Sequence, residues 1–195
     1  GFDEGAAGAA RARTVLTIQE GCDAFCTFCI IPFARGPARS VPPERVIAQA
    51  QRLVAAGAVE LILTGTAPGD YGADLPAGRD GRRPTFEALV DALLTQTAAP
   101  ADAPLTDGVP GAPTIRLGTL DPRELSAPLR ARLADTPRLA PHAHVSLQSP
   151  HDAILKRMKR RYTAADVRDC LHDLAAAEAR LERDRELAGG IYVGM

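Results

Sequence analysis

The sequence predicts an α/β protein built from parallel βαβ units. Short strand-like segments, apolar or alternating, begin near residues 14, 59, 114, 142 and 191, and segments with helical apolar spacing follow the first four of them. Parallel strands need crossover connections of this kind. Four complete units and the start of a fifth form either an open doubly wound sheet or part of a (β/α) barrel, and periodicity does not decide between them. In both cases ligands bind beyond the C-terminal ends of the strands.

The first half of the chain contains two predicted strands and two predicted helices. We expect residues 1–13 to form a linker and residues 14–195 to form the core domain. A strand over 14–19 is followed by a helix that begins at Pro42-Pro43-Glu44, where proline suits the first turn, and ends at Gly57. A second strand spans 59–64. A long loop over 67–84 precedes a helix around 86–94, and the Ala- and Pro-rich segment 98–113 reads as a peripheral insertion.

The second half repeats the alternation. We predict strands over 114–120 and 142–149, with a helix that starts at Asp121-Pro122-Arg123-Glu124 between them. A short helix passes through Ile154 and Met158. Thr163-Ala164-Ala165-Asp166 resembles a capping box that opens a long helix to about Leu187, and a fifth strand begins at 191–193.

Length and composition indicate one globular domain. The chain has 195 residues, of which 46% are hydrophobic and 24% charged. A net charge of −1 provides no basic field over the whole domain, so any RNA contact must be local or supplied from outside this chain. No apolar run has the length of a membrane span and no leader is visible, so we expect a soluble, cytoplasmic protein. The lack of an initiating Met and the end at Met195 suggest a piece of a longer protein.

Three of the four cysteines lie directly after the first predicted strand, in a C-x3-C-x2-C pattern. Cys22, Cys26 and Cys29 would place three thiolates at the ligand-binding end of the sheet. Structural zinc and ordinary electron-transfer clusters have four protein ligands, so three thiolates favour an iron site with one open position. The alternative is a zinc site that His142 or His144 completes.

The residues around these cysteines resemble a known family. The aromatic Phe28 before the last cysteine is typical of radical S-adenosylmethionine (SAM) enzymes, and the runs 18–22 and 29–40 are similar to the methylthiotransferases. The resemblance implies that Cys22, Cys26 and Cys29 hold a 4Fe–4S cluster. The fourth iron would chelate the amine and carboxylate of SAM, whose reductive cleavage gives a 5′-deoxyadenosyl radical. It also implies the partial (β/α) barrel of these enzymes, truncated after about four βα units.

Within the family, the chain is most similar to the threonylcarbamoyladenosine tRNA methylthiotransferases. The resemblance implies a transferase that adds a methylthio group to N6-threonylcarbamoyladenosine 37 of tRNA. Isopentenyladenosine tRNA and a ribosomal protein are alternative substrates within the family. A non-catalytic zinc-binding module is the alternative from another class.

The resemblance also implies partners outside this chain. Full-length members carry a domain with a second cluster that supplies sulfur, and an RNA-binding domain that contacts tRNA. A reductant such as flavodoxin or ferredoxin supplies electrons. We therefore expect this chain to bind a cluster and cleave SAM without completing methylthiolation alone.

Several further residues are candidates for cofactor contact. The resemblance places Phe28 beside the adenine, although it is also a plausible hydrophobic plug. Thr64 and Gly65 end the second strand, where the family contacts the methionyl amine; an ordinary strand-ending turn is the alternative. The run 70–72 resembles a segment of the family's substrate-facing loop, and we assign it no role.

The fourth predicted strand carries a polar row. His142, His144, Ser146 and Gln148 share one face of it, with Ser146 and Gln148 nearest the reactive end and assigned to the cofactor. A hydrogen-bonded structural row is the alternative, which we prefer for His142. Arg116, within the third strand, needs an acid or the cofactor carboxylate as a partner.

The remaining polar features are less specific. The basic run 156–161 is either a solvated helix face or a rim that contacts phosphate or carboxylate. Cys170 has the spacing of a buried small hydrophobe. Two turns depart from the family pattern, at Ser149-Pro150-His151 and at Gly118-Thr119, so their cofactor contacts are not carried over.

Overall fold

The computed structural model describes residues 13–98, 112–184 and 192–194. Its strands are β1 (Arg13–Glu20), β2 (Arg39–Ser40), β3 (Glu60–Gly65), β4 (Thr114–Leu117), β5 (Thr119–Leu120), β6 (His142–Val145) and β7 (Tyr192–Gly194). Its helices are α1 (Ile31–Arg35), α2 (Pro43–Ala55), the 3-10 helix η1 (Pro68–Asp70), α3 (Phe86–Gln96), α4 (Ala127–Asp135), α5 (Asp152–Arg157) and α6 (Ala164–Asp184). The predicted linker, apart from Arg13 in β1, lies outside the described residues. So do most of the predicted insertion 98–113 and the predicted helix end at Leu187.

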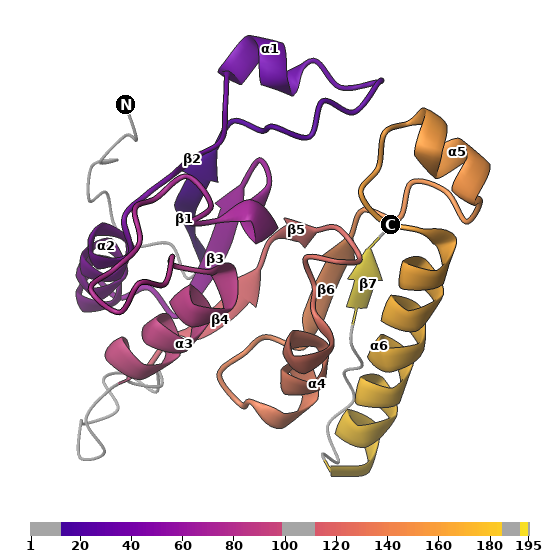
Figure 1. The fold of residues 1–195 in the computed structure, drawn as a ribbon. Coiled ribbons are helices and arrows are strands. Elements are labelled where there is room, and N and C mark those ends of the chain that lie inside the picture. Colours follow the sequence, from indigo (N-terminus) through magenta and orange to yellow (C-terminus); the bar gives the residue numbers. More distant parts are fainter. Residues whose placement is uncertain (1–12, 99–111, 185–191, 195) are drawn as a thin grey trace.

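The strands form two adjoining parallel segments of a half-barrel (Figure 1). One has the order β2-β1-β3-β4 and the other the order β5-β6-β7. All pairings are parallel except the short antiparallel pair β1–β2. A bridge between Ile115 and Leu139 joins the two segments. The predicted α/β class is therefore confirmed, and the partial barrel is the form that it takes.

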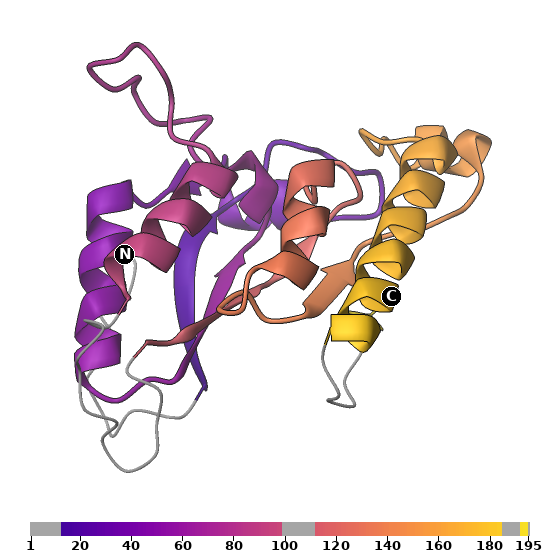
Figure 2. The same cartoon turned by 90° about the horizontal axis from the view of Figure 1, so that it is seen from below.

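The core lies between the sheet and the helices that connect its strands. Alternate strand residues are buried against these helices, among them Leu16, Ile18, Leu61, Leu63, Ile115, Leu117 and Val145. Figure 2 views the molecule from below and shows α2, α3 and α4 along one face of the strands. The opposite residues, such as Thr17, Thr64, Arg116 and His144, are only partly buried. The half-barrel therefore has an apolar outer face and a more polar inner face.

Local sequence signals explain where two helices begin or end. α2 has Pro43 in its first turn, and Gly57, with a φ of 94°, ends it as predicted. The predicted capping box is present at α6: the Thr163 hydroxyl accepts a hydrogen bond from Asp166 N (3.2 Å), and the Asp166 carboxylate accepts one from Thr163 N (2.7 Å). Both predictions are confirmed.

The predicted helix start at Asp121 is wrong, although its capping contacts form. Asp121 Oδ1 accepts a hydrogen bond from Glu124 N (3.0 Å), and the Glu124 carboxylate accepts one from Asp121 N (2.8 Å). The chain makes only a turn here, and α4 begins after Ser126, whose hydroxyl accepts from Leu129 N at 3.3 Å. A helix that continued from Asp121 would place Pro128 in its interior, where proline breaks a hydrogen bond. Pro128 instead lies in the first turn of α4.

Two predicted strands are shorter or interrupted. The strand 114–120 divides into β4 and β5 at Gly118, where a Cβ atom would lie 2.4 Å from Leu63 O. The strand 142–149 ends as β6 at Val145, and Gln148 has a left-handed backbone with a φ of 60°. Its parallel partner β5 has already ended at Leu120, and the hydrogen bond from Ser146 N to Leu120 O is the last between the two segments among the described residues. His142 and His144 still share a face, but Ser146 and Gln148 do not extend a strand.

Three short elements, α1, β2 and η1, have no counterpart in the sequence prediction. None of the described helices combines the length and apolar character needed to cross a bilayer. The loop with the three cysteines lies at the top of Figure 1 and α5 at its upper right, beyond the C-terminal ends of the strands. This edge of the half-barrel contains the candidate site.

Candidate functional site

The cysteine loop, residues 21–38, connects β1 to β2 and is closed at its base. Gln19 and Glu20 pair with Ser40 and Arg39 across the two strands. Gly21 has a φ of 74°, and a Cβ atom on it would lie 2.0 Å from Pro37 O. Only glycine fits this left-handed, closely packed position without rearrangement. Cys22 N then donates to Gly36 O at 3.2 Å, so the first cysteine is fixed at the base of the loop.

All described cysteines are free thiols. Cys26 is buried, whereas Cys22 and Cys29 are partly exposed. Burial raises the pKa of the Cys22 thiol, and the hydrogen bond from Ala24 N opposes this rise. No three His, Cys, Asp or Glu side chains within the described ranges are grouped closely enough to hold a metal ion. The fold thus places the three thiols on one loop, beyond the end of β1.

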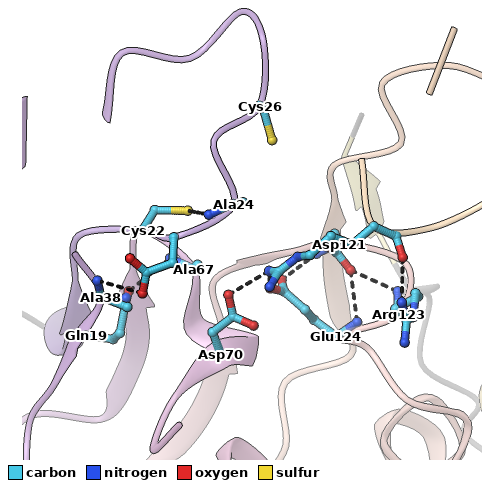
Figure 3. Close-up of polar contacts among 12 residues, drawn as sticks. Gln19, Cys22, Ala24, Cys26, Ala38, Ala67, Asp70, Asp121, Arg123 and Glu124 are labelled. Atoms are coloured by element: carbon cyan, nitrogen blue, oxygen red, sulfur yellow. Dashed lines mark hydrogen bonds and ion pairs between the residues drawn. The ribbon is translucent and has the colours of Figure 1, made fainter. Parts of the chain in front are cut away.

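Gln19 connects the cysteine loop to the loop after β3. Its side chain is completely buried; Nε2 donates to Gly21 O at 2.8 Å, and Oε1 accepts from Ala67 N at 2.9 Å (Figure 3). Gly65 lies against it, because a Cβ atom there would be 2.9 Å from Gln19 O. Packing against Gln19 is therefore a reason for a glycine at position 65 that does not depend on the methionyl contact implied by the resemblance.

The turn after α5 contacts the cysteine loop from the opposite side. Thr27 N donates to Met158 O at 3.2 Å, and the Thr27 hydroxyl donates to Arg157 O at 3.1 Å. Arg160 Nη1 lies 3.4 Å from Cys26 Sγ. Residues more than 120 positions apart in the sequence therefore form one edge of the site.

A group of charged side chains lies below the loop (Figure 3). Arg161 forms an ion pair with Asp70 at 2.6 Å and approaches Glu124 at 3.8 Å. Burial and the negative charge of Asp121 raise the pKa of Glu124 to about 7. These ion pairs connect η1, the turn after β5 and the turn after α5.

The basic run divides into two groups. Lys156, Arg157 and Lys159 are exposed. Arg160 and Arg161 instead turn toward the carboxylates and Cys26. The sequence allowed two interpretations of this run. The solvated face describes Lys156, Arg157 and Lys159, and the carboxylate contact describes Arg160 and Arg161.

The other sequence-predicted cofactor residues lie near the same edge. Thr64 and Gly65 end β3, next to the end of β1. Ser146 N donates to Leu120 O at 2.9 Å, and its carbonyl accepts from the Tyr162 hydroxyl. Gln148 is exposed, and Phe28 is 55% exposed on the cysteine loop. Their contacts with a cofactor stay predictions.

Arg116 does not lie at this edge. Its Nε donates to Glu60 at 2.7 Å, at the start of β3, and this contact holds the pKa of Glu60 below its ordinary value. The sequence left two possible partners for Arg116, an acid or the cofactor carboxylate. The guanidinium is already paired with the acid, Glu60. Cys170 is fully buried in the main core, as predicted.

The sequence analysis missed Gln19, Arg160 and Tyr162. Gln19 interrupts the alternation of β1 as a buried polar residue, a signal that indicates a specific hydrogen-bonding role. Arg160 lies in the basic run 156–161 and Tyr162 directly follows it, and composition alone does not show what either side chain contacts.

A parallel half-barrel with three cysteines in the loop after its first strand defines the radical SAM class of protein. The sequence model of the radical SAM superfamily matches residues 16–180, and this chain belongs to that superfamily. Membership implies a 4Fe–4S cluster and SAM as the cofactors of the class.

Within the superfamily, the chain is similar to tRNA methylthiotransferases. It is 35% identical to the threonylcarbamoyladenosine tRNA methylthiotransferase MtaB of Rickettsia prowazekii, over 92% of this chain and 39% of that protein. The MtaB of Bacillus subtilis is 38% identical, over 86% and 33%. A tRNA-2-methylthio-N(6)-dimethylallyladenosine synthase of Rhodopirellula baltica is 36% identical, over 79% and 29%. The chain therefore spans about two-fifths or less of the length of these relatives.

Solved structures support the fold independently. The radical SAM methyltransferase TsrM of Kitasatospora setae, solved with tryptophan and a SAM analogue, matches with a TM-score of 0.59 at 14% identity, over 85% of this chain and 28% of that one. The cobalamin-dependent radical SAM enzyme OxsB matches with a TM-score of 0.57 at 12% identity, over 92% and 23%. At such identities the similarity concerns the fold alone.

Proposed function

We propose that this chain is the radical SAM core of a tRNA methylthiotransferase that acts on N6-threonylcarbamoyladenosine 37. The observation that carries the proposal is the set of three free thiols on the loop after β1, at the C-terminal edge of a half-barrel. Similarity to two MtaB proteins over most of the chain supports the substrate assignment.

The donor set fits a 4Fe–4S cluster with one open iron. Cys22, Cys26 and Cys29 would hold three irons, and thiolates are the ligands that such clusters take. The loop that carries them is held at its base, where Gly21 packs against Pro37, and on its far side, where Thr27 N donates to Met158 O. When bound, the cluster supplies the electron that cleaves SAM. The chain's own contribution is to hold the ligands at the C-terminal edge of the half-barrel.

Residues near the same edge are the proposed SAM contacts. Phe28 is available to pack beside the adenine, and Thr64 and Gly65 are placed to meet the methionyl group. Ser146 and Gln148, which follow β6, are also proposed to contact SAM at the rim of the site. Arg116 pairs with Glu60, so a contact between Arg116 and SAM would require that ion pair to open.

Dimethylallyl- or isopentenyladenosine tRNA is the second candidate substrate. The 36% identity to a dimethylallyladenosine methylthio-synthase supports it. A zinc module requires a fourth ligand from His142 or His144. His144 Nδ1 instead lies 2.6 Å from the Thr119 hydroxyl, between β5 and β6 and not on the cysteine loop. No specific observation favours a ribosomal-protein substrate.

The proposed reaction requires partners. The exposed Lys156, Arg157 and Lys159 are available for local contact with tRNA, with further contact from segments outside this chain. A flavodoxin- or ferredoxin-type reductant and a second cluster that carries sulfur complete the reaction. A tRNA substrate supports a cytoplasmic location, which is part of this proposal.

Mass spectrometry of tRNA nucleosides tests the substrate. Deletion of the gene should remove 2-methylthio-N6-threonylcarbamoyladenosine and leave its precursor without the methylthio group, and complementation should restore the product. Loss of the methylthio-isopentenyl nucleoside would favour the second substrate. Unchanged levels of both nucleosides would refute the tRNA assignment.

A further inference from the structure

Arg160 makes a contact with Cys26 that neither the family match nor the relatives' names assign. Its Nη1 lies 3.4 Å from Cys26 Sγ, and its side chain is only 14% exposed. We propose that Arg160 is a positioning residue that donates a hydrogen bond to the sulfur of Cys26 and makes the cluster easier to reduce. This inference rests on the proposed function, since it requires Cys26 to be a cluster ligand.

The guanidinium is held by the ring of Tyr162 and by the carboxylate of Asp121. It stacks over the Tyr162 ring at 4.8 Å, and Nη2 lies 4.0 Å from Asp121 after β5. Tyr162 is itself buried, and its hydroxyl donates to Leu147 O at 3.0 Å after β6. An arginine held in this way loses little additional conformational entropy when it donates to a sulfur.

The backbone also fixes the direction of Arg160. Lys159 has a left-handed φ of 55°, and Arg160 N donates back to Leu155 O at 2.9 Å. This is the hydrogen-bond pattern that ends a helix sharply, so the side chain after it leaves α5 in a defined direction. That direction is toward the cysteine loop, where Thr27 already binds the carbonyls of the same turn.

The contact has a direct consequence for a cluster. Hydrogen bonds to ligand sulfurs and nearby positive charge stabilise the reduced, more negative state, and they are among the factors that set the potentials of iron–sulfur centres. A largely buried guanidinium acts strongly because solvent screens it little. Arg160 Nε is buried without a hydrogen-bond partner in the described part of the chain, so one more donor is available there.

The test compares the full 195-residue chain with its Arg160→Met and Arg160→Lys variants, each reconstituted anaerobically with iron and sulfide. The cluster is poised at a series of fixed potentials and its reduced fraction is measured by electron paramagnetic resonance. At one potential, the ratio of reduced to oxidised cluster should fall about tenfold in Arg160→Met, which is about 59 mV for a one-electron couple. Arg160→Lys should show a smaller change of the same sign, because it keeps the charge and loses the planar fork.

Arg157→Met is the matched control, because Arg157 is exposed on α5 and the substitution keeps the backbone carbonyl that contacts the loop. It should leave the reduction potential of the cluster unchanged.

Equal potentials in wild type and in a fully loaded Arg160 variant would contradict the proposal. So would a change confined to the Kd for SAM, which would assign Arg160 to the cofactor instead. If Arg160→Met does not fold, as judged by circular dichroism, the comparison of Arg160→Lys with wild type decides. A wild-type chain that takes up neither iron nor sulfide would refute the proposed function as well.

Discussion

The side-chain oxygen of Gln19 accepts a hydrogen bond from the backbone N–H of Ala67 at 2.9 Å, across 48 positions of sequence. The amide nitrogen of the same side chain donates to Gly21 O at 2.8 Å. One buried side chain therefore connects the base of the cysteine loop to the loop that follows β3. The arrangement of the two loops depends on this residue.

Replacement of Gln19 by leucine should destabilise the fold and loosen the cysteine loop. The variant leaves the Ala67 N–H and the Gly21 carbonyl buried without partners, and each unsatisfied group costs about 1–3 kcal/mol. We expect a loss of about 2–4 kcal/mol in the free energy of unfolding, measured by urea denaturation.

Gln51→Leu is the control for this change. Gln51 is an exposed glutamine that donates to Gln96 O at 3.1 Å, and its replacement should change stability by less than about 0.5 kcal/mol. Equal effects of the two substitutions would show that Gln19 has no special role.

Gly21→Ala should be more costly than Gly81→Ala. Both glycines have a positive φ, 74° and 76°, so alanine is strained at either position. A Cβ at Gly21 would lie 2.0 Å from Pro37 O, whereas none of the described atoms lies within 4 Å of a Cβ at Gly81. The difference isolates the steric clash at the base of the cysteine loop. We expect Gly21→Ala to cost about 1–3 kcal/mol more than Gly81→Ala in thermal or urea unfolding.

Glu124 should make stability depend on pH. Its pKa in the folded protein, about 7, lies above the ordinary value of 4.5, so the folded state binds this proton more tightly than the unfolded state does. The contribution is fully present below about pH 4.5 and is lost as the pH rises through about 7. Glu124→Gln removes this dependence, and relative to wild type it should gain up to about 3 kcal/mol at pH 8.

Urea denaturation of both proteins between pH 4.5 and pH 8 measures this difference. A Glu124→Gln variant whose stability follows pH with the wild-type slope over this range would contradict the assignment.

The sequence was sufficient for the order and type of the main elements, because these depend on local periodicity. The sequence was insufficient where a strand ends because of contacts with backbone atoms far away along the chain. The division of the third strand at Gly118 depends on the approach of Leu63 O, and the end of β6 depends on where β5 stops. The incorrect helix start at Asp121 was avoidable, because Pro128 would lie in the interior of a helix that began at Asp121.

The candidate site divides in the same way. The spacing of Cys22, Cys26 and Cys29 was visible in the sequence, and the strand before them predicted their place at the edge of the sheet. The contact between Arg160 and Cys26 spans 134 positions, and no local pattern indicates it. Ser146 and Gln148 were assigned from a strand alternation that ends at Val145, so their direction was not predictable from periodicity.

Cluster content of cysteine variants tests the central claim most directly. The full chain and its Cys22→Ala, Cys26→Ala, Cys29→Ala and Cys170→Ala variants are reconstituted anaerobically, and iron, sulfide and the optical spectrum are measured. We predict about four irons and four sulfides per wild-type chain, with SAM cleaved to 5′-deoxyadenosine on reduction. Cys170→Ala should retain the cluster, since Cys170 is buried in the core, and each of the other three substitutions should abolish it. Zinc without iron or sulfide in the wild type, or cluster retained after loss of Cys26, would contradict the account.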